Sequence, residues 1–448
     1  MPSQFDPASG TRDFLAAEFE RREQAFGAIR AVFQRYGFEP LQTPAFERLD
    51  VLLGKYGDEG DKLVFKILRR GEHEASGEAD LALRYDMTVP LARVAAAYGS
   101  QLSWPYKRYA MGPVWRADRP GKGRFREFVQ CDLDTLGSTS PLADAEVLCA
   151  HHDAMTEVGI GGFTVALNSR HVLAGLLEAY KISPELGTGV LTSLDKLDKL
   201  APADVTAELA ERGLARELAG ELVEVISAPD AADRIRAALK PSEEGLAGLD
   251  EVDAVLELAG AQLPAGRVVF TPSLVRGLSY YTGPIWEVRA PGAAGSLGGG
   301  GRYDHLIEAL GGPDVPAVGS SIGVERILSL LPDAAAGDRG RLDVGVTILG
   351  GEQAAGEQAA GELAAQSFAL AAAARAAGLR ASVYLGSSGK ISKQLRWASD
   401  QGARWCLIYG AREREAGLVK VRDMVSREEA DVAPAEVTDY LSRAAARA

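Results

Sequence analysis

The amino-acid sequence predicts an α+β protein with a further small α/β domain toward its carboxyl end, and three observations carry this prediction. Strand-like segments occur at residues 104–136 and 267–290, and helical segments fill residues 172–262 between them. Beyond residue 342, strands and helices alternate, which is typical of an α/β domain. With 448 residues, the chain is long enough for two or three domains with sizeable hydrophobic cores.

The amino-terminal part is predicted to begin with an amphipathic helix. In residues 14–36 large apolar side chains recur at helical spacing, and Gly37 provides a stop. A short strand at Glu39–Gln42 and a turn at Pro44 follow. Residues 104–136 then change to a strand, a connection rich in Gly, Pro and Arg, and a second strand. This order predicts two neighbouring strands joined by a long loop.

The middle of the chain is predicted to be helical and then to return to strands. Residues 172–262 are rich in Leu, Ala and charged side chains, which predicts helices. Strand character returns at 267–290. The glycines Gly298–Gly301 predict a turn that leads into a helix beginning near Tyr303. Residues 331–341, with the sequence LPDAAAGDRGR, have the composition of a linker.

The carboxyl-terminal part is predicted to alternate strand and helix. An apolar strand at Val344–Leu349 precedes an Ala-rich helix, and we interpret the duplicated GEQAA of residues 351–360 as part of that helical region. The GKISK stretch at 389–393 is interpreted as a helix start, because no glycine lies five residues before Gly389 as a phosphate-binding loop requires. The predicted segments are residues 1–171, 172–262, 263–331, a linker at 332–341, and 342–448.

Composition and charge limit the possible compartments and partners. The amino terminus lacks a basic start followed by an apolar stretch, and no run of eighteen apolar residues occurs, so we expect neither a signal peptide nor a membrane span. Three widely separated cysteines match no metal-ligand spacing and suit a reducing cytoplasm, and we expect no structural metal. The net charge is −13, but residues 341–448 carry 14 basic and 13 acidic side chains against 35 and 49 before them. Local basic patches therefore leave a nucleic-acid partner open.

Residues 106–137 form the first candidate site. In the second strand the side chains of Phe128, Gln130, Asp132 and Asp134 alternate with apolar ones and so share one face. This face either meets water or holds a polar ligand. The loop before the strand has five basic side chains within eleven residues, and they either are solvated or bind phosphates. These side chains are Arg116, Arg119, Lys122, Arg124 and Arg126.

Residues 273–331 contain the second candidate site. Clustered glycines allow close approach of a ligand to the backbone, although such clusters are common. Arg276 lies among strand-like apolar residues, where an unpaired charge is costly, so it needs an anionic partner. Tyr280 and Tyr281 are either ordinary core aromatics or ligand contacts.

Taken together, these segments resemble the class II aminoacyl-tRNA synthetases, and among them the histidine–tRNA ligases in their eukaryotic-type motif variants. The resemblance covers nearly the whole chain. The residues that carry it are GTRDF (10–14), GFEPLQTPAFE (37–47, motif 1), LRYDMTVPLAR (83–93), VWRADRPGKGRFREF (114–128, motif 2), DKLDK (195–199), VRGLSYYTG (275–283), GGGRYD (299–304), GVER (323–326, motif 3) and LVKVRDMVSREEADV (418–432).

The resemblance implies an architecture. It implies a catalytic domain with an antiparallel sheet flanked by helices in residues 1–171 and 263–331, interrupted by a helical insertion at 172–262 near the tRNA acceptor stem. Residues 342–448 would be an α/β anticodon-binding domain. The helix before motif 1 would build the interface of a homodimer.

The resemblance also implies substrates and site residues. The substrates would be L-histidine, ATP with Mg²⁺, and tRNA(His). Arg116 and Arg276 would be catalytic. ATP would contact Arg116, Asp118, Arg124, Phe128 and Arg326. Histidine would contact Asp86, Met87, Thr88, Arg116, Gln130, Asp134, Arg276, Tyr280 and Tyr281.

The implied chemistry agrees with these residue types. Attack of a histidine carboxylate on the α-phosphorus of ATP brings two anions together, and preorganised cations lower that barrier. Each well-placed arginine contributes on the order of 2.7–4 kcal/mol, judged from other charge-stabilising donors. Carboxylate, amide and phenol groups supply acceptors for the N–H groups of an imidazole ring.

One residue departs from the family pattern, and three other functions were weighed. Ser279 stands where the first histidine signature usually has Asp, which we interpret as a permissive position because the neighbouring motif residues are intact. A regulatory paralogue that binds histidine without chemistry would lose such motif residues and the last domain. This chain keeps Arg116, Arg276, Arg326 and that domain. A stress-kinase pseudo-synthetase would need a kinase domain, and a synthetase for another amino acid would lack the paired histidine signatures.

Overall fold

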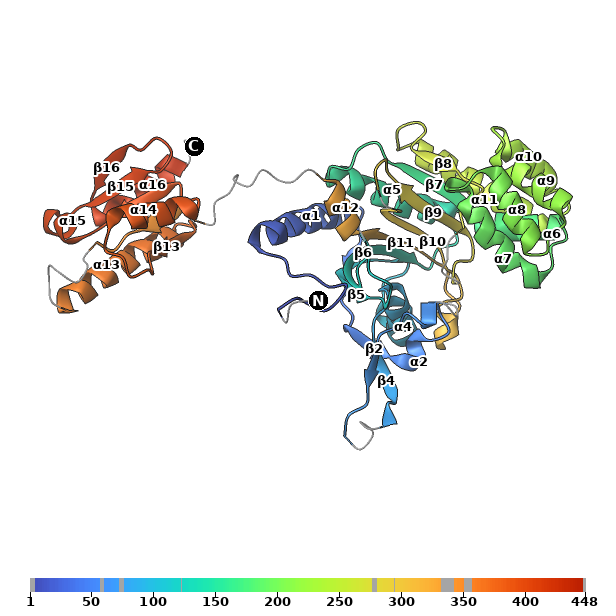
Figure 1. The fold of residues 1–448 in the computed structure, drawn as a ribbon, viewed down its shortest axis with the longest axis horizontal. Coiled ribbons are helices and arrows are strands. Elements are labelled where there is room, and N and C mark those ends of the chain that lie inside the picture. The colour runs from blue at the N-terminus through green and yellow to red at the C-terminus, as the bar shows by residue number, and fades with distance from the viewer. Residues whose placement is uncertain are drawn as a thin grey trace. The chain divides into compact units, whose positions relative to one another are not determined.

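A computed structural model gives the fold of the chain, and it describes residues 5–56, 60–71, 76–121, 123–275, 280–293, 295–331, 342–349 and 357–445. The chain divides into two compact units, Met1–Pro332 and Asp333–Ala448 (Figure 1). The first unit contains the larger sheet and a separate group of helices, and the second contains its own sheet and core. Among the helices described, none is long and apolar enough to cross a membrane.

The first unit is built on a sheet that has eight strands in the described part of the chain, in the order β1-β5-β6-β11-β10-β9-β7-β8. The six strands from β5 to β7 in this order pair antiparallel, and only the edge strands β1 and β8 pair parallel to their neighbours. The antiparallel sheet with helices that the resemblance implied is therefore confirmed. The strands are β1 (Glu39–Pro40), β5 (Tyr106–Trp115), β6 (Glu127–Leu136), β7 (Thr164–Ser169), β8 (Val268–Phe270), β9 (Pro284–Arg289), β10 (Gly298–Arg302) and β11 (Ala317–Gly323).

One face of this sheet is covered by helices and buries the main hydrophobic core. The core joins Ile29 and Phe33 of α1, Leu148 of α5 and Val255 of α11 to the inward side chains of the strands. Cys131 and Leu133 of β6 belong to this core, so the polar residues that alternate with them point to the opposite face. The helices are α1 (Ala16–Arg35), α5 (Pro141–Glu157), α11 (Glu243–Gly260) and α12 (Val324–Leu330).

The predicted helix at residues 14–36 is confirmed as α1, which ends shortly before Gly37. Gly37 has a φ of +77°. This left-handed conformation, which favours glycine, ends the helix.

The opposite face carries α4 and a smaller antiparallel sheet. Leu91 of α4 packs with Tyr303, Ile285 and Leu136 in a second core. The small sheet has the order β2-β4-β3 and extends away from the large sheet (Figure 1). These elements are β2 (Phe46–Arg48), α2 (Leu49–Leu52), β3 (Lys66–Leu68), β4 (Ala79–Leu83), α4 (Thr88–Tyr98) and η2 (Gly99–Gln101).

The predictions for residues 298–310 were wrong. Gly298–Gly301 do not form a turn but lie in the buried strand β10. This strand is rich in glycine because side chains would not fit between its neighbours. A Cβ on Gly300 would lie 2.2 Å from the Gly319 carbonyl oxygen of the neighbouring strand. No α-helix begins near Tyr303 in this described segment: turns lead to the 3-10 helix η4 (Glu308–Leu310). His305 has a φ of +69°, which a helix does not accommodate.

Residues 170–260 form the helical segment, which has its own hydrophobic core. Val172 and Leu176 pack in it with Val205, Leu222 and Leu249, and the predicted helical character is confirmed. The elements before α11 are α6 (Arg170–Ala179), α7 (Pro184–Leu194), η3 (Asp195–Asp198), α8 (Pro202–Glu211), α9 (Arg216–Ser227) and α10 (Ala231–Ala238).

The second unit contains a mixed sheet in the order β13-β12-β14-β15-β16. The first three strands in this order are parallel and the last two antiparallel, so the predicted α/β character is confirmed. The GKISK stretch does lead into a helix, α14. Most of the linker and residues 351–356 lie outside the described residues. The elements are β12 (Val344–Val346), α13 (Glu357–Ala376), β13 (Ala381–Val383), α14 (Ile391–Asp400), β14 (Trp405–Ile408), α15 (Ala411–Ala416), β15 (Val419–Asp423), β16 (Glu429–Val432), η5 (Pro434–Glu436) and α16 (Val437–Ala445).

Candidate active site

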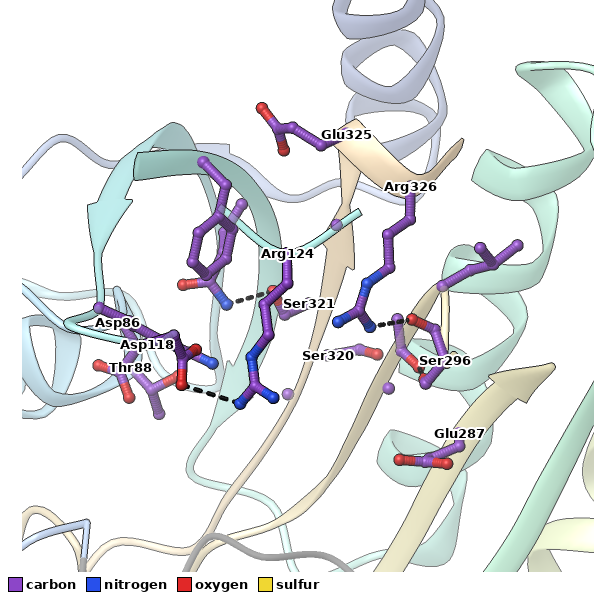
Figure 2. A pocket seen from close by; sticks show the side chains of 18 of the residues that line it. Asp86, Thr88, Asp118, Arg124, Glu287, Ser296, Ser320, Ser321, Glu325 and Arg326 are labelled. Carbon is purple, nitrogen blue, oxygen red and sulfur yellow. Dashed lines mark hydrogen bonds and ion pairs between the residues drawn. The ribbon is translucent and has the colours of Figure 1, made fainter. Parts of the chain in front are cut away.

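A pocket of about 280 Å³ lies on the face of the large sheet opposite to α1 and α5 (Figure 2). Its floor is formed by β6, β10 and β11, and its walls come from the loop between β5 and β6, from α12 and from the segment before α4. The lining residues are Asp86, Thr88, Arg116, Asp118, Gly123, Arg124, Phe125, Phe128, Gln130, Tyr280, Tyr281, Glu287, Ser296, Leu297, Gly298, Gly299, Tyr303, Gly319, Ser320, Ser321, Gly323, Glu325 and Arg326.

Three guanidinium groups gather on one side of the pocket, which we call the cationic side (Arg116, Arg124 and Arg326). Arg124 donates to Asp118 over 2.8 Å, and Arg326 donates to the Ser296 carbonyl over 2.6 Å (Figure 2). Burial lowers the pKa of Arg326, and the positive charges of Arg124 and Arg116 lower it further. Like charges held this close in a partly buried site destabilise each other. An anion bound between them would relieve that repulsion.

Aromatic rings hold Arg116 in place. Its guanidinium carbon lies 4.2 Å from the centre of the Tyr85 ring and 5.2 Å from that of Phe128. Its Nε also donates to the Tyr85 carbonyl over 3.1 Å. Cation–π contacts of this kind fix the plane of a guanidinium without neutralising its charge. Arg116 therefore keeps a full positive charge for a ligand.

Another part of the pocket, which we call the acceptor side, presents oxygen acceptors (Asp86, Thr88 and Gln130). Asp86 Oδ1 accepts the Val89 N–H over 3.0 Å and the Tyr56 hydroxyl over 3.3 Å. Burial raises the pKa of this carboxyl group above its ordinary value. Gln130 donates to the Ser321 hydroxyl over 2.7 Å. Asp86 Oδ2 and Gln130 Oε1 have no hydrogen-bond partner within the described part of the chain. Buried acceptors of this kind need donors.

Two tyrosines close the acceptor side. The rings of Tyr280 and Tyr281 lie 5.0 Å apart, and Tyr280 packs edge-on against Tyr303 at 5.9 Å. Burial raises the pKa of Tyr280 well above its ordinary value, so its hydroxyl keeps its proton at neutral pH. A neutral phenol can both donate and accept a hydrogen bond.

Three predicted site residues do not line the pocket or cannot be placed. Asp134 lies behind Tyr303, whose hydroxyl donates to it, and pairs with the fully buried Arg108 over 2.8 Å. Met87 packs below Phe128 in a small apolar cluster. Arg276 lies outside the described residues, as do Lys122 and Ser279. The other residues expected to contact ATP or histidine all line one pocket. Asp132, Arg119 and Arg126 of the first candidate site are not among its lining residues.

Several lining residues were missed at the level of sequence, among them Tyr303, Ser321, Glu287 and Glu325. Tyr303 stands inside a segment that carried the family resemblance and Ser321 lies just before one, but nothing in their spacing marked them. Glu287 is the one carboxylate in the apolar strand β9, and that isolation was an available signal. Glu325 accepts the Val129 N–H over 3.1 Å and pairs with buried Arg22 over 3.0 Å. It fixes α12, and so Arg326, against β6.

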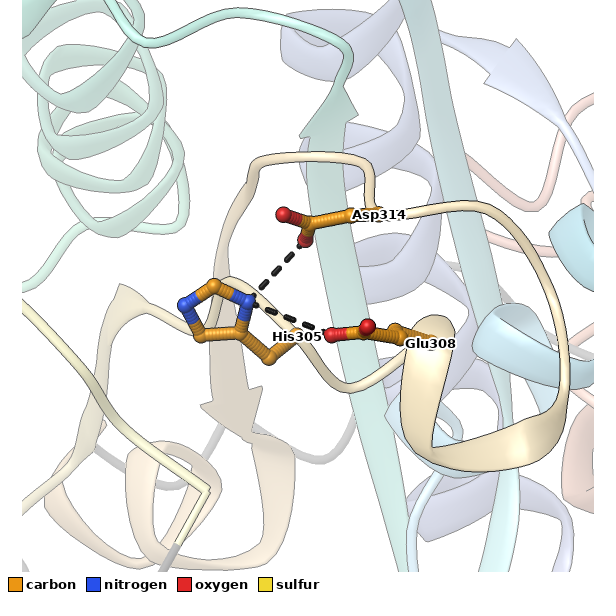
Figure 3. Close-up of side chains that lie close together, drawn as sticks. All are labelled: His305, Glu308 and Asp314. Atoms are coloured by element: carbon orange, nitrogen blue, oxygen red, sulfur yellow. Dashed lines mark hydrogen bonds and ion pairs between the residues drawn. The ribbon is translucent and has the colours of Figure 1, made fainter.

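A cluster outside the pocket could attract a metal ion by composition alone. His305 Nδ1 lies 3.0 Å from Asp314 and 3.6 Å from Glu308 (Figure 3). All three side chains are exposed, and the hydrogen bond between His305 and Asp314 accounts for their closeness. We assign this cluster no role in the site.

An antiparallel sheet with helices on one face, and arginines facing acceptors on the other, defines the catalytic domain of a class II aminoacyl-tRNA synthetase. The sequence model of the histidyl-tRNA synthetases matches residues 10–327, and that of an anticodon binding domain matches residues 343–444. The chain belongs to the histidyl-tRNA synthetase family.

Curated relatives and solved structures agree with this membership. A histidine–tRNA ligase of Phocaeicola vulgatus is 35% identical over 96% of this chain and 97% of its own length. That of Ruegeria pomeroyi is 38% identical, covering 93% and 88% respectively. The crystal structure of histidyl-tRNA synthetase from Nostoc sp. PCC 7120 superposes with a TM-score of 0.76 at 29% identity, over 99% of this chain and 100% of that chain.

Proposed function

We propose that the chain activates L-histidine with ATP and transfers it to the 3′-terminal adenosine of tRNA(His). Membership of the histidyl-tRNA synthetase family supports this reaction. The observation that carries the proposal is the meeting of three guanidinium groups with unpaired buried acceptors in one pocket. The phosphates of ATP require the first, and the ring N–H groups of histidine require the second.

On the cationic side, we propose that Arg116 binds the α-phosphate together with the histidine carboxylate, and that Arg326 binds the γ-phosphate. Phe128 offers a flat apolar face for the adenine ring. Arg124 completes the phosphate site, and Asp118 orients it through their 2.8 Å ion pair. The mutual repulsion of the arginines supports these roles, because it disappears when a polyanion binds between them.

On the acceptor side, we propose that Asp86, Thr88 and Gln130 hold histidine together with Tyr280 and Tyr281. Two further residues of the family pattern act from behind the pocket. Met87 packs against Phe128, and Asp134 accepts the hydroxyl of Tyr303, which itself lines the pocket. An amino acid without ring N–H groups would leave these buried acceptors unpaired, which gives the site its selectivity.

The reaction has two steps. A carboxylate oxygen of histidine attacks the α-phosphorus, the bond to the β-phosphate breaks, and pyrophosphate leaves. A ribose hydroxyl of the terminal adenosine then attacks the carbonyl carbon of the adenylate and releases AMP. We propose that Arg116 and Arg276 are the catalytic cations that stabilise the charge on the phosphoryl oxygens. If Arg276→Ala lowers the single-turnover adenylation rate by less than about tenfold, Arg276 does not have this role.

The remaining partners follow from the family. ATP arrives with Mg²⁺, and the pocket carboxylates Asp118 and Glu287 are oxygen ligands of the kind that Mg²⁺ prefers. The reaction takes place in the cytoplasm, where its three substrates are found. We propose a homodimer built on α1 and the segment after it. A monomeric mass in light scattering at micromolar concentration would refute this.

Each domain has a separate role in this proposal. Residues 1–171 and 263–331 are the two parts of the catalytic domain, and residues 172–262 are the insertion near the acceptor stem. Residues 332–341 link them to residues 342–448, which bind the anticodon. A chain ending near Leu331 that charges tRNA as efficiently as the full chain would contradict the anticodon role.

ATP–pyrophosphate exchange with each of the twenty amino acids, without tRNA, tests the function directly. We expect exchange with histidine alone, followed by charging of tRNA(His) in a second assay. Exchange with a different amino acid, or with none, would refute the proposal.

A further inference from the structure

The turn Asp195–Lys199, with the sequence DKLDK, has no part in the function described so far. It follows α7 and contains η3. Leu191 of α7 packs both in the core of the helical segment and in the core that contains Tyr281 and Tyr303. The end of α7 is therefore one of the places where the helical segment contacts the pocket-bearing sheet.

The backbone just before Arg276 is held from two directions. From the sheet, Asn168 Nδ2 donates to the carbonyl oxygens of Pro272 and Leu274, both over 3.0 Å. From the helical segment, Asp195 Oδ1 accepts the N–H of Val275 over 3.1 Å. Val275 is the last described residue before Arg276, and Tyr280 is the first after the gap. The second contact thus ties the helical segment to Val275, which packs in the same core as Tyr280 and Tyr281.

The surroundings of Asp195 make this contact necessary. Burial raises the pKa of the Asp195 carboxyl group, as do the negative charges of Glu287 and Asp198, while the Val275 N–H lowers it. A partly buried carboxylate among like charges is unfavourable without a donor. The amide of Val275 supplies that donor.

The same turn is also linked to the pocket residue Glu287 through an arginine. Asp198 Oδ2 lies 4.0 Å from the Arg289 guanidinium, which lies 3.6 Å from the carboxylate of Glu287. Glu287 lines the pocket. Asp198 is thus linked to the pocket residue Glu287 indirectly, through Arg289.

We propose that Asp195 is a positioning residue that holds the histidine-binding wall of the pocket in place from the helical segment. Through the Val275 N–H it anchors a residue that packs in the same core as Tyr280 and Tyr281. The inference rests on the proposed function for its effect on histidine, but the anchoring of Val275 stands independently of it. It gives the helical segment a direct physical link to amino-acid binding.

The test compares Asp195→Ala, which loses the acceptor, with Asp195→Asn, which keeps a carbonyl acceptor at the same place. Asp230→Ala is the matched control, because it removes an exposed carboxylate of the helical segment that pairs only with Arg234 in the described structure. ATP–pyrophosphate exchange gives kcat and KM for histidine and for ATP. Hydrogen–deuterium exchange of the peptide that contains Val275 reports the anchor itself.

We expect Asp195→Ala to lower kcat/KM for histidine by about tenfold or more, because small displacements of a binding wall are costly. The KM for ATP should change less than about twofold, since its proposed ligands lie on the loop between β5 and β6, on β6 and on α12. The Val275 peptide should exchange faster in this variant alone. Asp195→Asn and Asp230→Ala should resemble the wild type. If Asp195→Ala does not fold, Asp195→Glu displaces the acceptor by one methylene and should raise the KM for histidine in the same way.

Three results would overturn the inference: wild-type histidine kinetics in Asp195→Ala, equal losses for ATP and histidine, or a defect in Asp195→Asn as large as that of the alanine variant. A wild-type enzyme without histidine exchange would refute the proposed function instead. The Val275 peptide would then still decide whether Asp195 anchors that backbone.

Discussion

The two sides of the pocket are built in different ways. On the cationic side, Arg116, Arg124 and Phe128 come from one continuous stretch of motif 2, and only Arg326 comes from elsewhere. On the acceptor side, Asp86, Gln130 and Tyr280 belong to three segments that are far apart in the chain. A phosphate site needs several cations, which one loop can supply. A selective amino-acid site needs single groups at fixed angles, which requires the rigid frame of several strands.

The electrostatics of the two sides also differ. Among the arginines, burial and like charge lower the pKa of Arg326. On the acceptor side, burial raises the pKa of Asp86. Each side therefore holds charges that are unfavourable until a ligand of the complementary kind arrives. The sides should respond separately to substitution, with ATP affected on one and histidine on the other.

The largest expected effect is on the cationic side. Arg116→Ala should slow adenylation by about 100-fold or more, corresponding to about 2.7–4 kcal/mol of lost charge stabilisation. Single-turnover formation of the adenylate measures it. Arg236→Ala is the control, because Arg236 lies on α10 of the helical segment and forms exposed ion pairs with Asp250 and Asp253, and it should leave the rate unchanged. A loss smaller than about tenfold would remove Arg116 from the catalytic groups.

A substitution on the acceptor side should change the KM for histidine and leave the KM for ATP unchanged. Asp86→Asn keeps the shape of the side chain but removes its charge, and a hydrogen bond to a charged group contributes about 1.5–3 kcal/mol. The KM for histidine in pyrophosphate exchange should rise about tenfold or more. The KM for ATP should stay the same. A parallel rise of both constants would show that the two sides are not independent.

The buried carboxyl groups below the acceptor side should make stability depend on pH. Burial raises the pKa of Asp132 to about 7. Because this folded-state pKa lies above the ordinary unfolded value, the folded protein retains a proton that the unfolded chain loses as the pH rises from about 4. Stability from this group is therefore greatest at low pH and is lost as the pH rises through about 7.

Asp132→Asn should flatten this dependence by about 1–3 kcal/mol in the free energy of unfolding between pH 5 and pH 8. Urea denaturation of both proteins across that range measures it. Equal slopes would mean that Asp132 titrates normally.

The smallest effect concerns a single neutral hydrogen bond. Ser321→Ala leaves the Gln130 amide without its 2.7 Å acceptor, at a cost of about 0.5–1.5 kcal/mol. The KM for histidine should rise about fivefold, corresponding to the middle of that range. Exchange kinetics again measure it, and an unchanged KM would place Gln130 outside the histidine site.

Much of the fold could be predicted from local pattern. The helix α1, the strands β5 and β6 and the helical segment follow from periodicity, because each buries one regular face. The glycines of β10 could not be interpreted in this way. Their absence of side chains reflects the close approach of Gly319 and Trp286 from the neighbouring strands, and not a turn. A local pattern cannot distinguish these two uses of glycine.

The site residues also fall into two groups, those that the local sequence marked and those that it did not. The arginines of motif 2 were marked by their own density in the sequence, and Arg326 by its motif. Tyr303 and Glu287 were not marked, because their importance depends on which strands become neighbours in the sheet. Asp134 shares a strand face with Gln130 as predicted, yet it lies one layer deeper, behind Tyr303.

By itself, the sequence determined the elements, the residue types of the site and the family. Local propensity and side-chain chemistry reside in the residues themselves. Only the tertiary structure decided which groups meet in one pocket, which are shielded behind others, and that Asp195 of the helical segment reaches the amide of Val275. Those contacts join residues far apart in the chain, and their geometry is set by the packing of the sheet and helices around them.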